Sequence, residues 1–154
     1  MLTVQATEVI ASRPEELLGF VMDVERYAEV DRKIRPVRWV RRADGFTEFG
    51  FRPRLAGLPG AVSVAQMRLT PGERVDIRLA PAPANRLTRL ASDFDASFVC
   101  VPVDGGTRLV RTLSFHFRPA LRWLAEPVLR RRLTAEVEEE VRLLKAHLER
   151  SELS

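Results

Sequence analysis

The sequence predicts an α+β fold in which a curved antiparallel sheet wraps around one long C-terminal helix. Two patterns carry this prediction: apolar residues recur at steps of three and four along residues 119–150, and period-two patterns alternate with turn sequences between residues 34 and 118. The chain has 154 residues, of which 45% are hydrophobic and 30% are charged. This is the balance of one globular domain with a real core, so we expect a single domain over residues 1–154.

The C-terminal helix is the longest predicted element. At ~1.5 Å per residue it would be roughly 45 Å long, which is more than a surface cover requires. Pro127 cannot donate a backbone hydrogen bond, so we expect a kink or a restart of the helix there. The apolar stripe consists of Leu121, Leu124, Val128, Leu129, Leu133, Val137, Val141, Leu144 and Leu148.

The N-terminal part is predicted to form one strand and two short helices. Residues 2–11 alternate as a strand does, and this alternation puts Glu8 on the same side as its apolar neighbours. Pro14, followed by two acidic residues, is typical of a helix start. Residues 23–27 open a second helical piece that ends near Val30.

Six further strands follow in antiparallel order, separated by turn sequences such as Asp44-Gly45 and Asp104-Gly105-Gly106. They are expected at residues 37–41, 47–53, 61–69, 73–80, 93–103 and 107–118. A bent seven-stranded sheet is hard to fill with one helix. We therefore expect an internal cavity at one end of the sheet.

Composition narrows the classes of function. Cys100 is the only cysteine, which excludes a disulfide framework and suits the cytoplasm. The first residues lack the pattern of a signal peptide and no stretch is apolar enough for a membrane span, so we expect a cytoplasmic protein. His116 and His147, the only histidines, lack a second ligand at useful spacing, and we expect neither a metal nor a cofactor.

The charge of the chain is compatible with a nucleic-acid-binding protein. The net charge of +4 and an isoelectric point near 10.1 permit nucleic-acid binding. No basic run is interleaved with stacking aromatics, however, so the sequence does not indicate it.

The order of elements, together with three strings, resembles the START-like (SRPBCC) superfamily with its helix-grip fold, and within it the polyketide cyclase/dehydrase and lipid-transport branch. The strings are IASRPEE at residues 10–16, FVMDVERY at 20–27 and GGTRL at 105–109. The resemblance implies a hydrophobic pocket between the sheet and the long helix. Members of the superfamily use this pocket to bind lipids, to carry quinones, or to fold and cyclise polyketide chains.

Two charged side chains are predicted to point inward. Arg111 alternates with Leu109, Leu113 and Phe115, so it shares their buried face. The first and last strands pair in helix-grip proteins, which implies that Glu8 and Arg111 meet in the cavity. A buried charge is costly unless it is paired, so this is either a structural ion pair or a polar anchor for a ligand carbonyl or carboxylate.

Three other polar residues are candidates for the site. One register of strand 61–69 sends Gln66 and Arg68 into the concavity, and the opposite register turns Arg68 out to water. Aromatase/cyclases of the superfamily carry an arginine in a comparable strand, although their neighbouring tryptophan- and serine-rich string is replaced here by residues 61–65. Tyr27 either donates a hydrogen bond to a substrate carbonyl or caps the core.

The remaining predicted ligand-binding residues are apolar walls: Trp39, Phe98, Phe115, Trp123, Leu124 and Val128. We expect a small hydrophobic ligand, such as a lipid, a polyketide or an aromatic molecule, bound by a monomer or a homodimer. Two alternatives stay open. One is an active aromatase/cyclase or dehydratase that uses Arg68, Arg111, Glu8 or Tyr27. The other is a quinone-binding or ribosome-associated interaction module.

Overall fold

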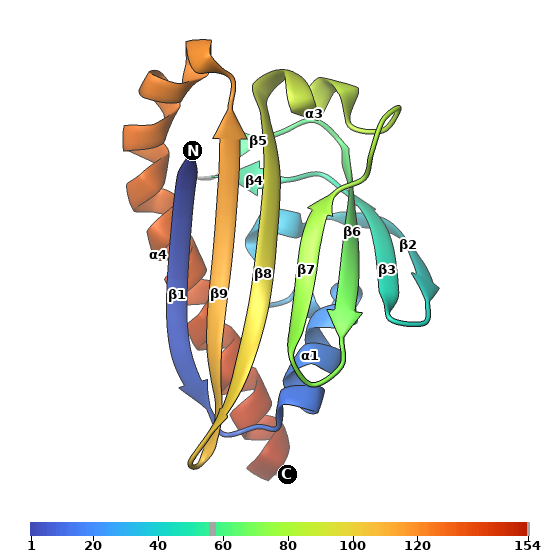
Figure 1. The fold of residues 1–154 in the computed structure, drawn as a ribbon, viewed down its shortest axis with the longest axis vertical. Helices are drawn as coiled ribbons and strands as arrows, with labels where there is room; N and C mark the ends of the chain where they lie inside the picture. Colours follow the sequence, from blue (N-terminus) through green and yellow to red (C-terminus); the bar gives the residue numbers. More distant parts are fainter. Residues whose placement is uncertain (56–57, 154) are drawn as a thin grey trace.

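The computed structural model describes residues 1–55 and 58–153, except the side chains at 55, 91, 124, 125 and 151–153. Its main element is a seven-stranded antiparallel sheet in the order β1-β9-β8-β7-β6-β3-β2 (Figure 1). The strands are β1 (Leu2–Ile10), β2 (Val37–Ala43), β3 (Phe46–Phe51), β6 (Ser63–Thr70), β7 (Arg74–Leu79), β8 (Ser92–Val103) and β9 (Gly106–Phe117). With the helix α4 (Pro119–Leu153) at the C-terminus, this confirms the predicted fold class.

Helices α1 (Pro14–Met22) and α2 (Val24–Tyr27) and a single 3-10 turn, η1 (Arg32–Ile34), connect β1 to β2. A small hairpin and a short helix were not predicted. Strands β4 (Arg54–Leu55) and β5 (Leu58–Pro59) form a separate small hairpin, and helix α3 (Arg86–Ala91) lies between β7 and β8. Asn85 fixes the start of α3, because its side-chain amide bonds to the backbone of Val64 and Ala80.

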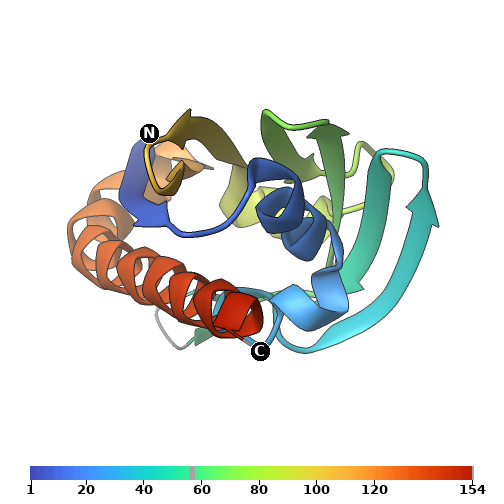
Figure 2. The same ribbon diagram turned by 90° about the horizontal axis from the view of Figure 1, so that it is seen from below.

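The concave face of the sheet is covered by two helical pieces rather than by one. Helix α4 packs against β1 and β9, while α1 packs against β6, β7 and β8 (Figure 2). The buried side of α1 consists of Leu17, Leu18, Phe20 and Val21. These side chains fill much of the space that a single helix would have left open.

Only the C-terminal two thirds of α4 is held by the sheet. Its buried side chains are Leu133, Val137, Val141, Leu144 and Leu148. Leu121, Trp123 and Val128, which were predicted to be buried, are exposed because the first turns of α4 lie beyond the core. We predicted a kink or a restart of the helix at Pro127. The helix runs without a break through Pro127, so a restart is wrong.

Candidate functional site

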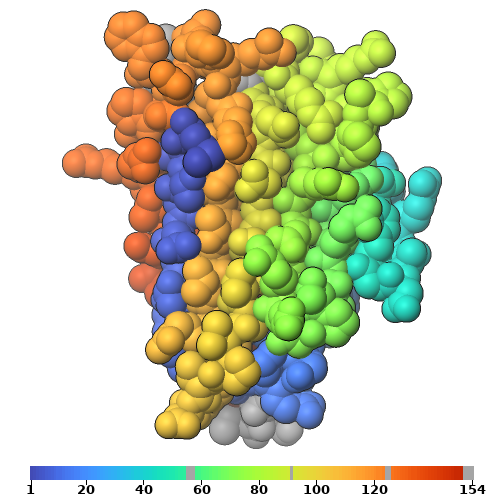
Figure 3. Space-filling view, viewed as in Figure 1, coloured from blue at the N-terminus to red at the C-terminus, as the bar shows by residue number. Residues whose placement is uncertain are grey.

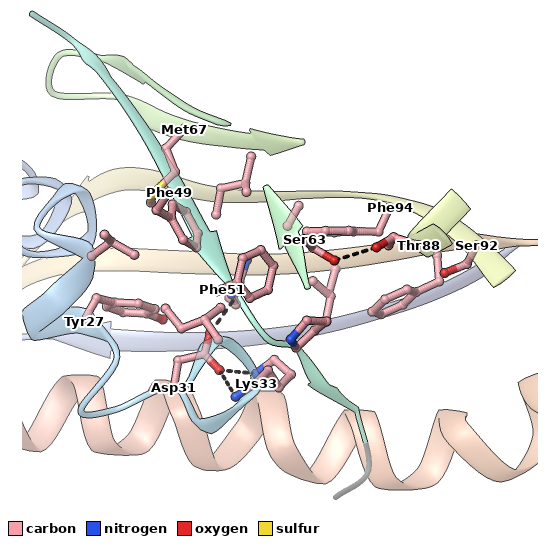
Figure 4. A pocket seen from close by; sticks show the side chains of 18 residues that line it. Tyr27, Asp31, Lys33, Phe49, Phe51, Ser63, Met67, Thr88, Ser92 and Phe94 are labelled. Atoms are coloured by element: carbon pink, nitrogen blue, oxygen red, sulfur yellow. Dashed lines mark hydrogen bonds and ion pairs between the residues drawn. The ribbon is translucent and has the colours of Figure 1, made fainter. Parts of the chain in front are cut away.

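A cavity lies between the concave face of the sheet and the helical layer (Figure 4). Its walls are largely apolar and include Phe49, Phe51 and Met67 from the β3–β6 side and Phe94 and Phe115 from the β8–β9 side. Its volume is about 80 Å³. That is room for roughly five water molecules, and it is well below the ~300 Å³ or more of pockets for drug-sized ligands.

Three ionisable side chains, Asp31, Lys33 and Arg111, line the inner end of the cavity. Glu140 lies behind them, paired with Lys33 and Arg111, and we call these four residues the charged cluster. The Nζ of Lys33 lies 2.9 Å from Oδ1 of Asp31 and 2.6 Å from Oε1 of Glu140. The Nε of Arg111 donates to Oε2 of Glu140 at 3.0 Å, and its NH2 nitrogen lies 3.8 Å from Oδ2 of Asp31. All four side chains are buried, and two positive charges face two negative ones, so the formal charge of the cluster is zero.

Local structure explains how these four side chains meet. Oδ1 of Asp31 accepts the backbone N–H of Lys33 at 3.0 Å, which closes the η1 turn and aims both side chains inward. Arg111 lies on the buried face of β9, and its guanidinium stacks 4.1 Å from the ring centre of Phe98. Glu140 lies on the side of α4 that faces the sheet.

The electrostatics follow from burial and pairing. Burial by itself opposes the ionised form of Glu140, but Arg111 and Lys33 outweigh it and lower the pKa of this carboxyl to about 2. Burial likewise opposes the charged forms of Lys33 and Arg111, yet the facing carboxylates raise the pKa of both. Glu140, Lys33 and Arg111 therefore stay ionised at neutral pH.

Tyr27 joins the cluster to the cavity wall. Its hydroxyl donates to Oε2 of Glu140, and its ring packs edge-on against Phe98 at 5.3 Å. Burial, and then the negative charge of Glu140, raise the pKa of Tyr27 well above its ordinary value. Tyr27 is therefore a neutral hydrogen-bond donor at any physiological pH.

The opposite end of the cavity carries hydroxyl groups. The side chains of Ser63 and Thr88 lie within hydrogen-bond distance, 2.7 Å apart, and Ser92 lies close by (Figure 4). The cavity thus has an apolar middle, a charged inner end and a hydroxyl-lined outer end.

The profile of the polyketide cyclase/dehydrase and lipid transport family matches residues 1–149. The chain belongs to this family. The resemblance carried by the three sequence strings is thereby confirmed. A search of curated proteins finds no match.

Solved structures of similar fold come from several bacteria. The protein TTHA0849 from Thermus thermophilus has a TM-score of 0.77 and 16% identity, covering 97% of this chain and 98% of that one. The Zhui aromatase/cyclase from Streptomyces sp. R1128 has a TM-score of 0.77 and 17% identity, covering 96% and 93%. A START superfamily protein from Mycobacterium smegmatis has a TM-score of 0.69 and 17% identity, covering 96% and 97%. At such identities the likeness shows the shared fold alone.

Within this family member, the predicted pairing of Glu8 with Arg111 is wrong. The strands β1 and β9 pair as expected, but the register places Ala6 opposite Arg111 and Glu8 opposite Leu109. Glu8 is only half-buried and lies 3.9 Å from the Nζ of Lys145. Arg111 does point inward as predicted, and Glu140 and Asp31 supply its negative partners.

Strand β6 adopts the register that turns Arg68 out to water. Ala65 and Met67 are buried, whereas Arg68 is exposed and stacks 5.0 Å from the ring centre of Phe46. Gln66 lies on the same outer side and donates to Glu48 at 3.0 Å. Neither Arg68 nor Gln66 lines the cavity, so the inward placement of both is wrong.

Of the other residues predicted to bind the ligand, only some line the cavity. Tyr27, Arg111 and Phe115 line the cavity. Phe98 is fully buried behind Tyr27 and Arg111, while Trp39 and Val128 are exposed and lie away from it. Leu124 lies outside the described side chains.

Sequence reasoning missed Asp31, Lys33 and Glu140. Glu140 stands three residues after Val137 and four before Leu144, so it lies on the apolar stripe of its own helix. That spacing was the available signal, although the acidic run 138–140 is typical of a solvated face. Asp31 and Lys33 follow no periodic pattern, and only the η1 turn brings them inward.

Residues 1–55 and 58–153 contain neither a candidate metal centre nor a candidate membrane-spanning helix. No group of three or more histidine, cysteine, aspartate or glutamate side chains is placed there to hold a metal ion. Among the described helices, none is both long and apolar enough to cross a membrane.

Proposed function

We propose that this protein binds a small, mainly apolar molecule that carries an oxygen acceptor, in the cavity between the sheet and α4. The observation that carries this proposal is the charged cluster at the end of an apolar cavity. Apolar walls favour an apolar guest, and a few convergent polar groups fix its orientation.

The chemistry of the cluster indicates which group the ligand presents. The ammonium of Lys33 and the guanidinium of Arg111 carry more N–H groups than the described hydrogen bonds of these side chains use. Both carboxylates already accept bonds from within the cluster. A carbonyl or carboxylate oxygen of a ligand is therefore the complement that this end of the cavity favours.

The size of the cavity limits the guest. A volume of about 80 Å³ suits a short acyl chain or part of a single ring rather than a long polyketide. A larger ligand requires side chains to move, and Met67 is the most adaptable of those in the wall because its side chain is unbranched.

Binding is favoured over catalysis by the same electrostatics. A general acid or base works best with a pKa near the operating pH, whereas the pKa of Glu140 is lowered to about 2 and that of Tyr27 is raised well above its ordinary value. These groups can orient and polarise a carbonyl. They are poorly matched to taking up and releasing a proton in each turnover.

The test compares two leucine substitutions on neighbouring residues of β8. Ala96 lines the cavity, while Ser97 faces the outer side of the sheet next to Arg68, so Ala96→Leu fills the cavity and Ser97→Leu does not. Isothermal titration calorimetry with benzoate, hexanoate and 2-naphthoate measures affinity, and circular dichroism checks that each variant is folded. We expect Ala96→Leu to weaken binding tenfold or more and Ser97→Leu and Arg68→Ala to leave it unchanged.

Native mass spectrometry of freshly purified protein gives a second readout that does not depend on the probes. A retained small molecule that is lost in Ala96→Leu supports the proposal. Binding that is equal in Ala96→Leu and wild type would exclude this cavity as the site.

A further inference from the structure

One end of the molecule exposes several large apolar side chains. Leu87 and Leu90 on α3 are 70% and 62% exposed, and Leu121 and Trp123 near the start of α4 are 41% and 81% exposed. Both helices lie at the same end, opposite the hairpin between β8 and β9 (Figure 1). Scattered single apolar residues are ordinary on a protein surface, but large ones gathered at one end indicate an interaction site.

The two helical segments lie next to each other. The Nε of Arg118, one residue before α4, donates to the backbone oxygen of Arg89 in α3 at 3.3 Å. In the space-filling view, the atoms of both segments form the upper edge of the molecule (Figure 3). We call Arg86, Leu87, Leu90, Leu121, Arg122 and Trp123 the α3–α4 surface.

This end of the molecule carries more positive than negative charge. Residues 81–93 and 117–126 contain four arginines and two acidic residues, Asp93 and Glu126. Glu126 is paired with the N-terminal nitrogen of Met1 at 3.1 Å. Arg89 has an acidic neighbour in Asp93 at 3.9 Å, whereas Arg86 and Arg122 have no ion pair among the described contacts.

We propose that the α3–α4 surface docks on a membrane of anionic lipids. Leucine and tryptophan side chains partition into the headgroup boundary, where tryptophan is especially favoured, and arginines beside them attract lipid phosphates. A nucleic acid would pair with the arginines but would not bury the exposed leucines, so it is the less suitable partner. A two-fold dimer through this surface would bring its own arginines against each other.

The position of the surface links it to the cavity. Thr88 lies between Leu87 and Leu90 in α3, and its side chain lines the outer end of the cavity. The helix that would enter the lipid boundary on one side therefore forms part of the cavity wall on the other. A ligand taken from a membrane would meet the cavity at this end.

Tryptophan fluorescence tests the docking directly. The chain has two tryptophans, so Trp39→Phe leaves Trp123 as the sole reporter. With vesicles that contain phosphatidylglycerol, we expect the emission of Trp123 to shift to shorter wavelength and binding to weaken at high salt. With pure phosphatidylcholine vesicles we expect binding at least tenfold weaker. No shift on phosphatidylglycerol vesicles would overturn the proposal.

Paired substitutions separate the apolar and electrostatic contributions. Flotation with phosphatidylglycerol vesicles should show roughly tenfold or greater loss of binding for the double variant Leu87→Ser/Leu90→Ser and for Arg86→Ser/Arg122→Ser. Val9→Ser and Val101→Ser, which change exposed valines on the sheet, are matched controls that should bind as wild type.

Two results would contradict docking through this surface. One is equal vesicle binding by the double variants and the controls. The other is a Trp123 shift that appears without vesicles and grows with protein concentration, which would show self-association instead. Docking through this surface does not depend on a ligand in the cavity. We therefore expect Ala96→Leu to leave vesicle binding intact.

Discussion

Arg111 of β9 and Glu140 of α4 form a buried ion pair, with 3.0 Å between Nε and Oε2. The two side chains are 3% and 2% exposed, so water does little to screen or replace this contact. The pair joins β9, the strand next to the edge strand β1, to the helix that packs against both. It helps to fix the position of α4, and it holds Arg111 in place as part of the cavity wall.

Glu140→Gln should destabilise the protein strongly. The substitution leaves Lys33 and Arg111 buried with one negative partner, Asp31, and removing one side of a buried ion pair typically costs about 3–5 kcal/mol. Urea unfolding followed by circular dichroism measures the change. Glu139→Gln is the control, because Glu139 is half-exposed and its ion pair with Arg32 should be worth at most about 1 kcal/mol. Equal effects of the two substitutions would contradict the role of the cluster.

The same glutamate predicts a loss of stability in acid. Its pKa is about 2 in the folded protein against an ordinary value of 4.5, so its contribution is complete above pH 4.5 and is lost as the pH falls toward 2. This shift corresponds to about 3 kcal/mol. The free energy of unfolding should therefore converge between wild type and Glu140→Gln over that range. A constant difference from pH 7 to pH 2 would show that Glu140 does not titrate in this way.

Tyr27 is the only tyrosine, so its ionisation can be followed without interference. Burial and the nearby Glu140 raise its pKa well above 10, and ionisation therefore opposes folding as the pH rises. Tyrosinate absorbance should stay absent near pH 10 and develop only as the circular dichroism of the fold is lost. A titration with its midpoint near 10 in folded protein would argue against the buried hydrogen bond.

Cys100 should be a poorly reactive thiol in the folded state. Burial, followed by the charge of Glu15, raises its pKa to about 11, and the thiolate is the reactive form. Reaction with a chromogenic disulfide reagent should be slow for native protein and rapid in denaturant. Glu15→Gln should speed it slightly, since the larger contribution comes from burial. Rapid labelling of native protein would show that Cys100 is accessible.

Local sequence was enough to place most of the strands. Alternation located the strands around Arg111 and Phe115 and their inward face, because a strand repeats every two residues whatever it packs against. It could not settle the register of the strand carrying Arg68. Both faces of this strand carry hydrophobic and polar residues, so only pairing with β3 and β7 decides which side is buried.

The length of the C-terminal helix was also readable from the sequence, but the part of it that is buried was not. Leu133 and Val128 look alike in the apolar stripe, and only the position of the sheet buries the first and exposes the second.

What the sequence by itself determined is the α+β order of elements, the antiparallel sheet, the long helix and the inward direction of Arg111. What only the tertiary structure decided is which residues meet Arg111. Periodicity fixes the side of an element on which a residue lies, whereas ion pairs join residues distant in sequence, and their meeting depends on how the elements pack. The acidic partners of Arg111 are Glu140 from α4 and Asp31 from the segment before η1, whereas Glu8 was predicted to be its partner.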